Sequence, residues 1–232
     1  MKLAIMQPYI FPYIGYFQLL NAVDKFVVYD DVNYIKQGWI NRNNVLGQTG
    51  PNRITIPLVA ASSNKLINQV EIDHRKPWQK KMIRTIEQTY SKAPHFNSVF
   101  PFVQKTIEKK DSFIADLARE SLLRCKEYLE ISTVVINSSE IYDNIELSGP
   151  NRVLDICAKE GATTYINASG GKALYDPSFF KKNGVELKFI QSKISPYNQY
   201  NQSFQPSLSI LDVLMFCSKD EVKNMLSNYS LE

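Results

Sequence analysis

The sequence predicts an α/β protein with a Rossmann-like, mainly parallel sheet flanked by helices, with a hairpin and a helical insertion. Short apolar runs alternate along the chain with segments of helical periodicity, the pattern of parallel strands joined by helices. A strand, a loop, a helix and a second strand also follow one another within residues 3–29. The length of 232 residues suits one large domain, so we expect a single α/β domain over 1–232.

The first elements follow from short-range patterns. The apolar run 3–6 ends just before Pro8 and predicts a buried strand followed by a loop. Apolar residues at helical spacing predict a helix over 13–23, and the β-branched run 26–29 predicts the second strand. Within 38–57, turn residues separate two alternating runs, which indicates a hairpin, and a further short strand is expected at 70–73.

The composition then changes. Residues 77–90 and 112–129 carry helical periodicity with many Lys and Glu, which indicates a helical insertion or subdomain at about 77–130. After this segment, predicted strands and helices alternate again. We expect strands at 133–137, 164–166 and 185–190, and helices at 151–160 and 209–228. Pro150 and Gly161 bracket the first of these helices, and Ser218 with Glu221 has the spacing of a capping box.

Composition narrows the class of protein. Hydrophobic residues make up 44% and charged residues 22%, as in ordinary soluble proteins. The net charge of +4 fits phosphate-bearing ligands but alone does not indicate nucleic acid. Three scattered cysteines exclude a disulfide framework or a zinc site and indicate buried free thiols. The N-terminal run is too short for a signal peptide and no run is long enough for a membrane span, so we expect a cytoplasmic protein.

The stretch "QPYIFPYIGYF" leaves the first strand at the edge of the sheet where α/β proteins bind ligands. Its prolines fix the path of the loop, its aromatic rings can wall a pocket, and Gln7 offers a polar contact. Gly15 lets the following helix begin close to a ligand. We expect Gln7, Tyr13, Gly15 and Tyr16 to bind substrate.

The stretch "YDDVNYIKQGWINRNNV" follows the second strand at the same edge. Its carboxylates can orient an amine or sugar hydroxyls, and its cations can hold phosphate. A solvated loop explains any single one of these residues equally well, but both loops together, with Trp39 beside the charges, favour a small-molecule pocket. The candidates are Asp30, Asp31, Lys36, Asn41 and Arg42.

Two later stretches carry further candidates. In "TYINASGGKAL", Ser169, Gly170, Gly171 and Lys172 can cradle an anion, although Ile166 breaks the P-loop spacing and a plain tight turn is an alternative. In "QSKISPYNQYNQSFQPSLSILDVL", amides and aromatic rings suit a sugar, although an ordinary polar loop has the same composition. Glutamine recurs there at 191, 199, 202 and 205. The candidates are Gln191, Tyr197, Gln199 and Asp212, and Asp212 is alternatively a helix-end acid. No metal site is predicted, and no cofactor is identified.

These stretches, with "YSKAPHF" and "GATTYINASGGKALY", resemble the WbqC-like protein family over nearly the whole chain. The resemblance implies a role in bacterial surface polysaccharide (O-antigen, lipopolysaccharide) biosynthesis. It suggests a transferase that forms an amide on a nucleotide-linked amino sugar by acyl or aminoacyl transfer. Ala168 stands where the family pattern has a glycine. The pattern marks Gln7, Pro8, Gly15, Tyr16, Asp30, Asp31, Lys36, Asn41, Arg42, Tyr90, Gly161, Tyr165, Ser169, Gly171, Tyr175, Gln191, Tyr197, Gln199, Phe204, Ser209 and Asp212.

The implied reaction gives these residues roles. Asp31, or next Asp30, would act as the base that takes the proton of the amine. Arg42, Lys36 and Lys172 would hold phosphate, and Tyr197 and Gln199 would contact sugar. The partners are then a nucleotide-linked sugar and an acyl or aminoacyl donor.

Two other functions remain open. One is a non-catalytic sugar-binding module that assists polysaccharide assembly. The other is a glycosyltransferase, which ranks lower because the adjacent Asp30–Asp31 pair is not a spaced DxD motif. The opening also resembles α/β nucleotidyltransferases with an HxGH loop, but "YIGY" lacks both histidines, so adenylyl transfer is not implied.

Overall fold

A six-stranded sheet forms the centre of the protein in this computed structural model, which describes residues 1–200 and 203–232; Gln202, one of the recurring glutamines, lies outside them. The strand order is β5-β2-β1-β6-β7-β8. All neighbours pair in parallel except β7 and β8, which are antiparallel. The predicted Rossmann-like α/β class is confirmed. The strands are β1 (Lys2–Met6), β2 (Lys25–Val28), β5 (Val134–Ile136), β6 (Thr164–Ala168), β7 (Glu186–Ser192) and β8 (Tyr229–Leu231).

The strand order reverses at β1. The chain builds outward from β1 to β2 and β5, then returns to the other side of β1 with β6 and β7. The connections carry α1 (Ile14–Asn21), α5 (Gly149–Glu160) and α6 (Pro177–Lys182). The carboxyl ends of β1 and β6 therefore flank the topological switch point, where open α/β sheets bind ligands.

The buried apolar side chains form two core clusters, and successive residues of a strand belong to different clusters. Leu3 and Ile5 of β1 belong to the cluster with α5 and α6, whereas Ala4 between them belongs to the cluster with α1. Successive side chains of a strand point to opposite faces, so both faces of the sheet are covered. Three helices, α2 (Trp78–Tyr90), α3 (Phe96–Glu108) and α4 (Ile114–Tyr128), share the α1 cluster.

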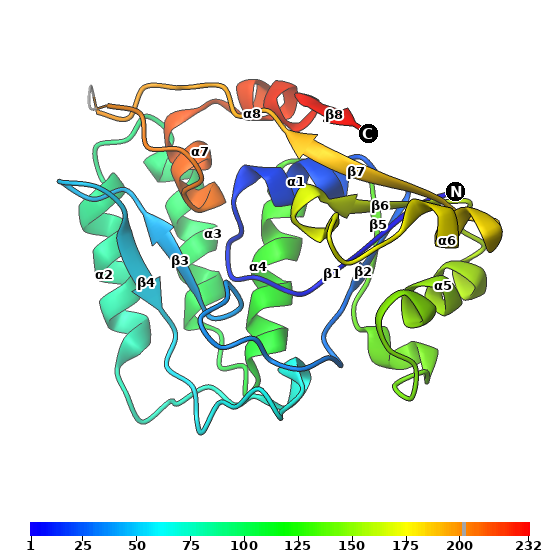
Figure 1. Cartoon of the computed structure of the whole chain (residues 1–232). Coiled ribbons are helices and arrows are strands. Elements are labelled where there is room, and N and C mark those ends of the chain that lie inside the picture. Colours follow the sequence, from blue (N-terminus) through cyan, green and yellow to red (C-terminus); the bar gives the residue numbers. More distant parts are fainter. Residues whose placement is uncertain (201–202) are drawn as a thin grey trace.

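The predicted hairpin forms from β3 (Arg42–Val45) and β4 (Asn52–Thr55), paired antiparallel. In Figure 1 the arrowheads of β6 and β7 point toward the half of the molecule that holds this hairpin, α2 and α7 (Ile210–Phe216). The loops that leave the parallel strands thus run toward the hairpin.

Two predicted elements are wrong. Residues 70–73 form isolated bridges, Leu58 with Ile72 and Glu71 with Phe113, instead of a strand. The helix expected over 209–228 is two helices, α7 and α8 (Lys219–Leu226), because Cys217 is extended. The predicted capping box of Ser218 and Glu221 is present, and it starts the second helix.

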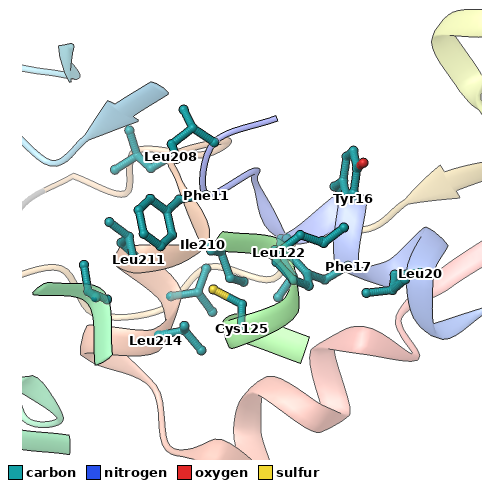
Figure 2. Packing of buried hydrophobic residues seen from close by; sticks show 14 of the residues in the cluster. Phe11, Tyr16, Phe17, Leu20, Leu122, Cys125, Leu208, Ile210, Leu211 and Leu214 are labelled. Carbon is teal, nitrogen blue, oxygen red and sulfur yellow. The ribbon is translucent and has the colours of Figure 1, made fainter. Parts of the chain in front are cut away.

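Phe11, in the loop after β1, is fully buried although it lies in a connection. Figure 2 shows its ring among Leu208, Ile210 and Leu211, at the start of α7. The loop therefore uses its own side chain as part of the core. The three cysteines are free and buried, as predicted, and burial raises the pKa of Cys157 and of Cys217 to about 12. In the part of the chain that the structure describes, no helix has the length and apolar character needed to span a bilayer.

Candidate functional site

The loop after β1 has a fixed and unusual backbone. Phe11 has a φ of +40°, which side chains other than glycine seldom adopt. Its N–H donates to Ser121 Oγ at 3.0 Å, and its carbonyl accepts from Asn43 Nδ2 at 2.7 Å and from Ser209 Oγ at 2.8 Å. Such backbone conformations persist where the surroundings hold them and cluster at ligand sites. The helix α4, the hairpin and α7 all hold this loop in place.

A pocket of about 340 Å³ opens beside this loop. Three aromatic side chains face it, with one buried amide, Asn43. Burial and the neighbouring Tyr13 raise the pKa of Tyr9, so its hydroxyl stays protonated and can donate a hydrogen bond. We call this the aromatic pocket; its lining residues are Tyr9, Pro12, Tyr13, Trp39, Asn43 and Ser207.

Gly15 and Tyr16 support this loop from the first turn of α1. A Cβ built on Gly15 would lie 2.4 Å from the ring of Tyr13 and 2.5 Å from Ser192 Oγ, so no larger residue fits without displacing them. Tyr16 is buried, and its hydroxyl donates to the carbonyl oxygen of Gln7 at 2.8 Å. The side chain of Gln7 is half-buried at the switch point. Tyr16 therefore positions backbone, whereas Tyr13 reaches the pocket.

Asp30 follows β2 and is only 2% exposed. Its Oδ1 accepts from Ser138 Oγ at 2.7 Å and from the Ser139 N–H at 3.2 Å. Both of these bonds meet Oδ1, and among residues 1–200 and 203–232 no other residue donates a hydrogen bond to Oδ2. Burial raises the pKa of Asp30, and these hydrogen bonds lower it by less. A raised pKa and an unoccupied oxygen are the properties of a general base.

Asp31 has a different environment. It forms a buried ion pair with Arg152, and its other carboxylate oxygen accepts from the hydroxyl of Ser139. Arg152 also donates to the Asp31 carbonyl oxygen at 3.1 Å and to Asn144 Oδ1 at 2.9 Å. Its guanidinium lies 5.1 Å from the ring centre of Tyr29. Both oxygens of Asp31 are thus engaged, and the residue anchors α5 to the end of β2.

The other candidates of the second loop have different environments. Lys36 is exposed, and Arg42 donates through Nε to the carbonyl oxygen of Gly38 at 2.9 Å. Asn41 accepts from Tyr34 and donates to the carbonyl oxygen of Ile56, each at 2.8 Å. The side chain of Asn41 therefore has a structural role, whereas the two cations keep donors for a ligand.

Residues 169–171 form a short 3-10 turn after β6, at the switch point. A Cβ on Gly171 would lie 2.3 Å from Asn167 Nδ2, so this glycine allows the turn to pack closely against the side chain of Asn167. Gly170 and Ser169 are at least partly exposed in the same turn. Lys172 forms an ion pair with Glu232. The turn lies at the predicted edge, but the charge of its lysine is partly neutralised.

Five further candidates are not among the residues that line the aromatic pocket. Asp212 is fully buried and accepts from Tyr197 at 2.6 Å and from Gln199 at 2.5 Å. Tyr90 donates to its other oxygen at 2.9 Å, and burial raises the pKa of Asp212. This network joins α2, α7 and the loop before α7. Gln191 is exposed in β7; Tyr175, the fifth such residue, packs against the rings of Tyr165 and Phe180.

The sequence did not single out Asn43, Ser138, Ser139 and Arg152, which support the site. Ser138 and Ser139 follow β5, so the rule that places ligands at strand ends could have found them. No pattern distinguishes Arg152 from other helix arginines, because its role depends on a contact 121 residues away.

Residues 7–224 match the WbqC-like protein family. The chain is 31% identical over 218 residues to the uncharacterized protein Rv1507c of Mycobacterium tuberculosis, and the match covers 92% of each chain. No solved structure matches this chain. The long matched range and this relative confirm the resemblance drawn from the motifs: the chain belongs to the WbqC-like protein family.

Proposed function

We propose that this protein is a transferase of bacterial surface polysaccharide biosynthesis, which forms an amide on the amine of a nucleotide-linked amino sugar. The family suggests a role in polysaccharide biosynthesis. The observation that carries the proposal is the aromatic pocket at the ligand-binding edge of the sheet, with a buried aspartate after the neighbouring strand.

The aromatic pocket has the chemistry of a sugar site. Sugars need a flat apolar partner for their C–H faces and several hydrogen bonds for their hydroxyls. Tyr9, Tyr13 and Trp39 offer ring faces, and the two tyrosine hydroxyls offer donors and acceptors. The volume of about 340 Å³ lies within the range of small-molecule pockets.

Asp30 is the better base of the two aspartates. A sugar amine must be neutral to attack an acyl carbon, and Asp30 Oδ2 would take the proton that the nitrogen loses. The N–C bond forms, the bond from the acyl carbon to its leaving group breaks, and the leaving group departs with the bonding electrons. Asp31, engaged with Arg152, would act as a positioning residue beside it.

The phosphates of the substrate would meet the second loop. Lys36 and Arg42 are the cations of this loop, and within the described residues Arg42 donates through Nε alone. The paired N–H donors of an arginine guanidinium suit two phosphate oxygens, and a lysine adds positive charge. Lys172 would bind phosphate only if its ion pair with Glu232 broke.

The test is a search for product by mass. The protein is incubated with nucleotide-linked amino sugars and activated acyl or aminoacyl donors, and a mass gain on the sugar nucleotide is sought. Asp30→Asn should lower the rate at least about a hundredfold, as expected for a lost general base, and keep sugar-nucleotide binding. The matched control is Asp143→Asn on the surface, which should keep the wild-type rate. No product from any donor would defeat the proposal.

A second function, a non-catalytic sugar-binding module, also has an observation in its favour. None of the residues that line the aromatic pocket is an acid, so binding there does not require Asp30. A module would bind the sugar nucleotide and yield no product by itself. In cells, Asp30→Asn would leave the polysaccharide unchanged if the protein is such a module and abolish it if the protein is the transferase.

A further inference from the structure

A groove runs between β4 and α2. Two adjoining cavities, of about 230 and 410 Å³, share Thr85 as a common wall. One wall of the groove comes from residues 52–55 of β4, and the other from residues one or two helical turns apart along α2. This spacing forms a continuous face of the helix.

One end of the groove is cationic. Arg53 and Lys81 both line the smaller cavity, and among the residues that the structure describes neither forms an ion pair with an acid. Trp78 lines the same cavity and is 6% exposed. Within the described residues its indole N–H is buried and has no acceptor. Buried donors in folded proteins nearly always have a partner, so this end is deficient in acceptors.

The other end is rich in amides. Gln48, Asn52 and Gln88 are exposed and line the larger cavity. Tyr200 closes it: its hydroxyl donates to the Thr89 carbonyl at 3.0 Å, which fixes the orientation of its ring. Amides that donate and accept, beside a fixed aromatic ring, suit a chain of sugar hydroxyls.

We propose that this groove binds an anionic oligosaccharide, with an acidic group at Arg53 and Lys81 and neutral hydroxyls along Gln48, Asn52 and Gln88. Arg53 also lies 6.0 Å from the ring centre of Trp39, which lines the aromatic pocket. The groove therefore begins beside the aromatic pocket and extends away from it. It gives the protein a second saccharide site, for a longer chain, that requires neither Asp30 nor acyl transfer.

The two tryptophans allow the two sites to be followed separately. The chain has only Trp39 and Trp78, so its two indole ¹H–¹⁵N NMR signals can be assigned with Trp78→Phe. The probes are tetragalacturonate and the neutral maltotetraose. Tetragalacturonate should shift the Trp78 signal in a saturable way. Lys81→Glu should weaken this binding at least about tenfold, and the control Lys80→Glu on the same helix should change it less than about threefold.

Maltotetraose should bind at least about tenfold more weakly than the acidic probe. A Trp78 signal that does not saturate with tetragalacturonate would overturn the proposal, as would equal effects of Lys80→Glu and Lys81→Glu. A shift of the Trp39 signal alone would also overturn it, because the probe would then occupy the aromatic pocket and not the groove. That last result would leave the proposed transferase function intact.

Discussion

The side-chain amide of Asn43 donates to the carbonyl oxygen of Phe11 at 2.7 Å, across 32 residues of sequence. The same nitrogen donates to the carbonyl oxygen of Ile10 at 3.0 Å. This one side chain joins the hairpin to the loop after β1, and both line the aromatic pocket. The shape of the pocket therefore depends on a contact between two separate segments.

Asn43→Ala should destabilise the protein by about 2 kcal/mol, because it removes donors from two buried carbonyl oxygens. Urea denaturation measures this change in the free energy of unfolding. The matched control is Asn44→Ala, since Asn44 lies on the opposite face of β3 and its side-chain oxygen accepts a longer bond, 3.3 Å, from Arg53 Nε. If the two variants lose the same stability, the contact with Phe11 is not what holds the loop.

Gly15→Ala should lower affinity for a nucleotide-linked amino sugar at least about tenfold, or about 1.4 kcal/mol, while stability changes by less than about 1 kcal/mol. The added methyl group would displace the ring of Tyr13 from the pocket. Calorimetry measures the affinity, and thermal denaturation measures the stability.

A second variant separates the two clashes at Gly15. Adding Ser192→Gly to Gly15→Ala removes the clash with Ser192 and leaves the one with Tyr13. The double variant should keep the low affinity. Recovery of full affinity would show that Tyr13 is not the residue through which Gly15 acts.

The sequence predicted the parallel sheet well, because local periodicity determines strands such as 3–6 and helices such as 151–160. It overextended the helix at 209–228, since nothing in the apolar pattern marks the break at Cys217. The expected strand at 70–73 has the right composition, but its residues find only single-bridge partners. Partners of this kind are set by tertiary structure and not by local pattern.

The candidate site was predicted in part. The loops after β1 and β2 lie at the expected edge, because strand order alone brings them there. The different environments of Asp30 and Asp31 were not predictable, since they depend on Ser138 and Arg152, over 100 residues away. In the same way, the burial of Asp212 against Tyr197 could not be read from the composition of that stretch.

Asp30→Asn should become more stable relative to wild type as the pH rises from about 4 to 8. Burial raises the pKa of Asp30 above its usual value of 3.8, so the folded protein binds this proton more tightly than the unfolded chain. The resulting stabilisation is full below pH 3.8 and is lost as the pH rises through the pKa of the folded state. Asparagine has no such proton to lose. Urea denaturation of both proteins at a series of pH values tests this, and a stability difference that stays constant with pH would contradict it.

Arg152→Leu should destabilise the protein by about 3–5 kcal/mol, because Asp31 would remain as a buried charge without a partner. Adding Asp31→Asn to that variant should restore part of the loss, since the buried group is then neutral. Chemical denaturation gives both values. A loss below about 1 kcal/mol for Arg152→Leu would mean that the ion pair does not anchor α5 to β2.

The most direct test of the account is whether a sugar nucleotide binds against Trp39 and Tyr13. The indole ¹H–¹⁵N signal of Trp39 is followed while a nucleotide-linked amino sugar is added to wild type and to Tyr13→Ala. We predict a saturable shift of this signal in wild type and at least about tenfold weaker binding in Tyr13→Ala, with Trp78 unchanged. A Trp39 signal that does not respond, or equal affinity in the two proteins, would contradict the proposal that the aromatic pocket is the substrate site.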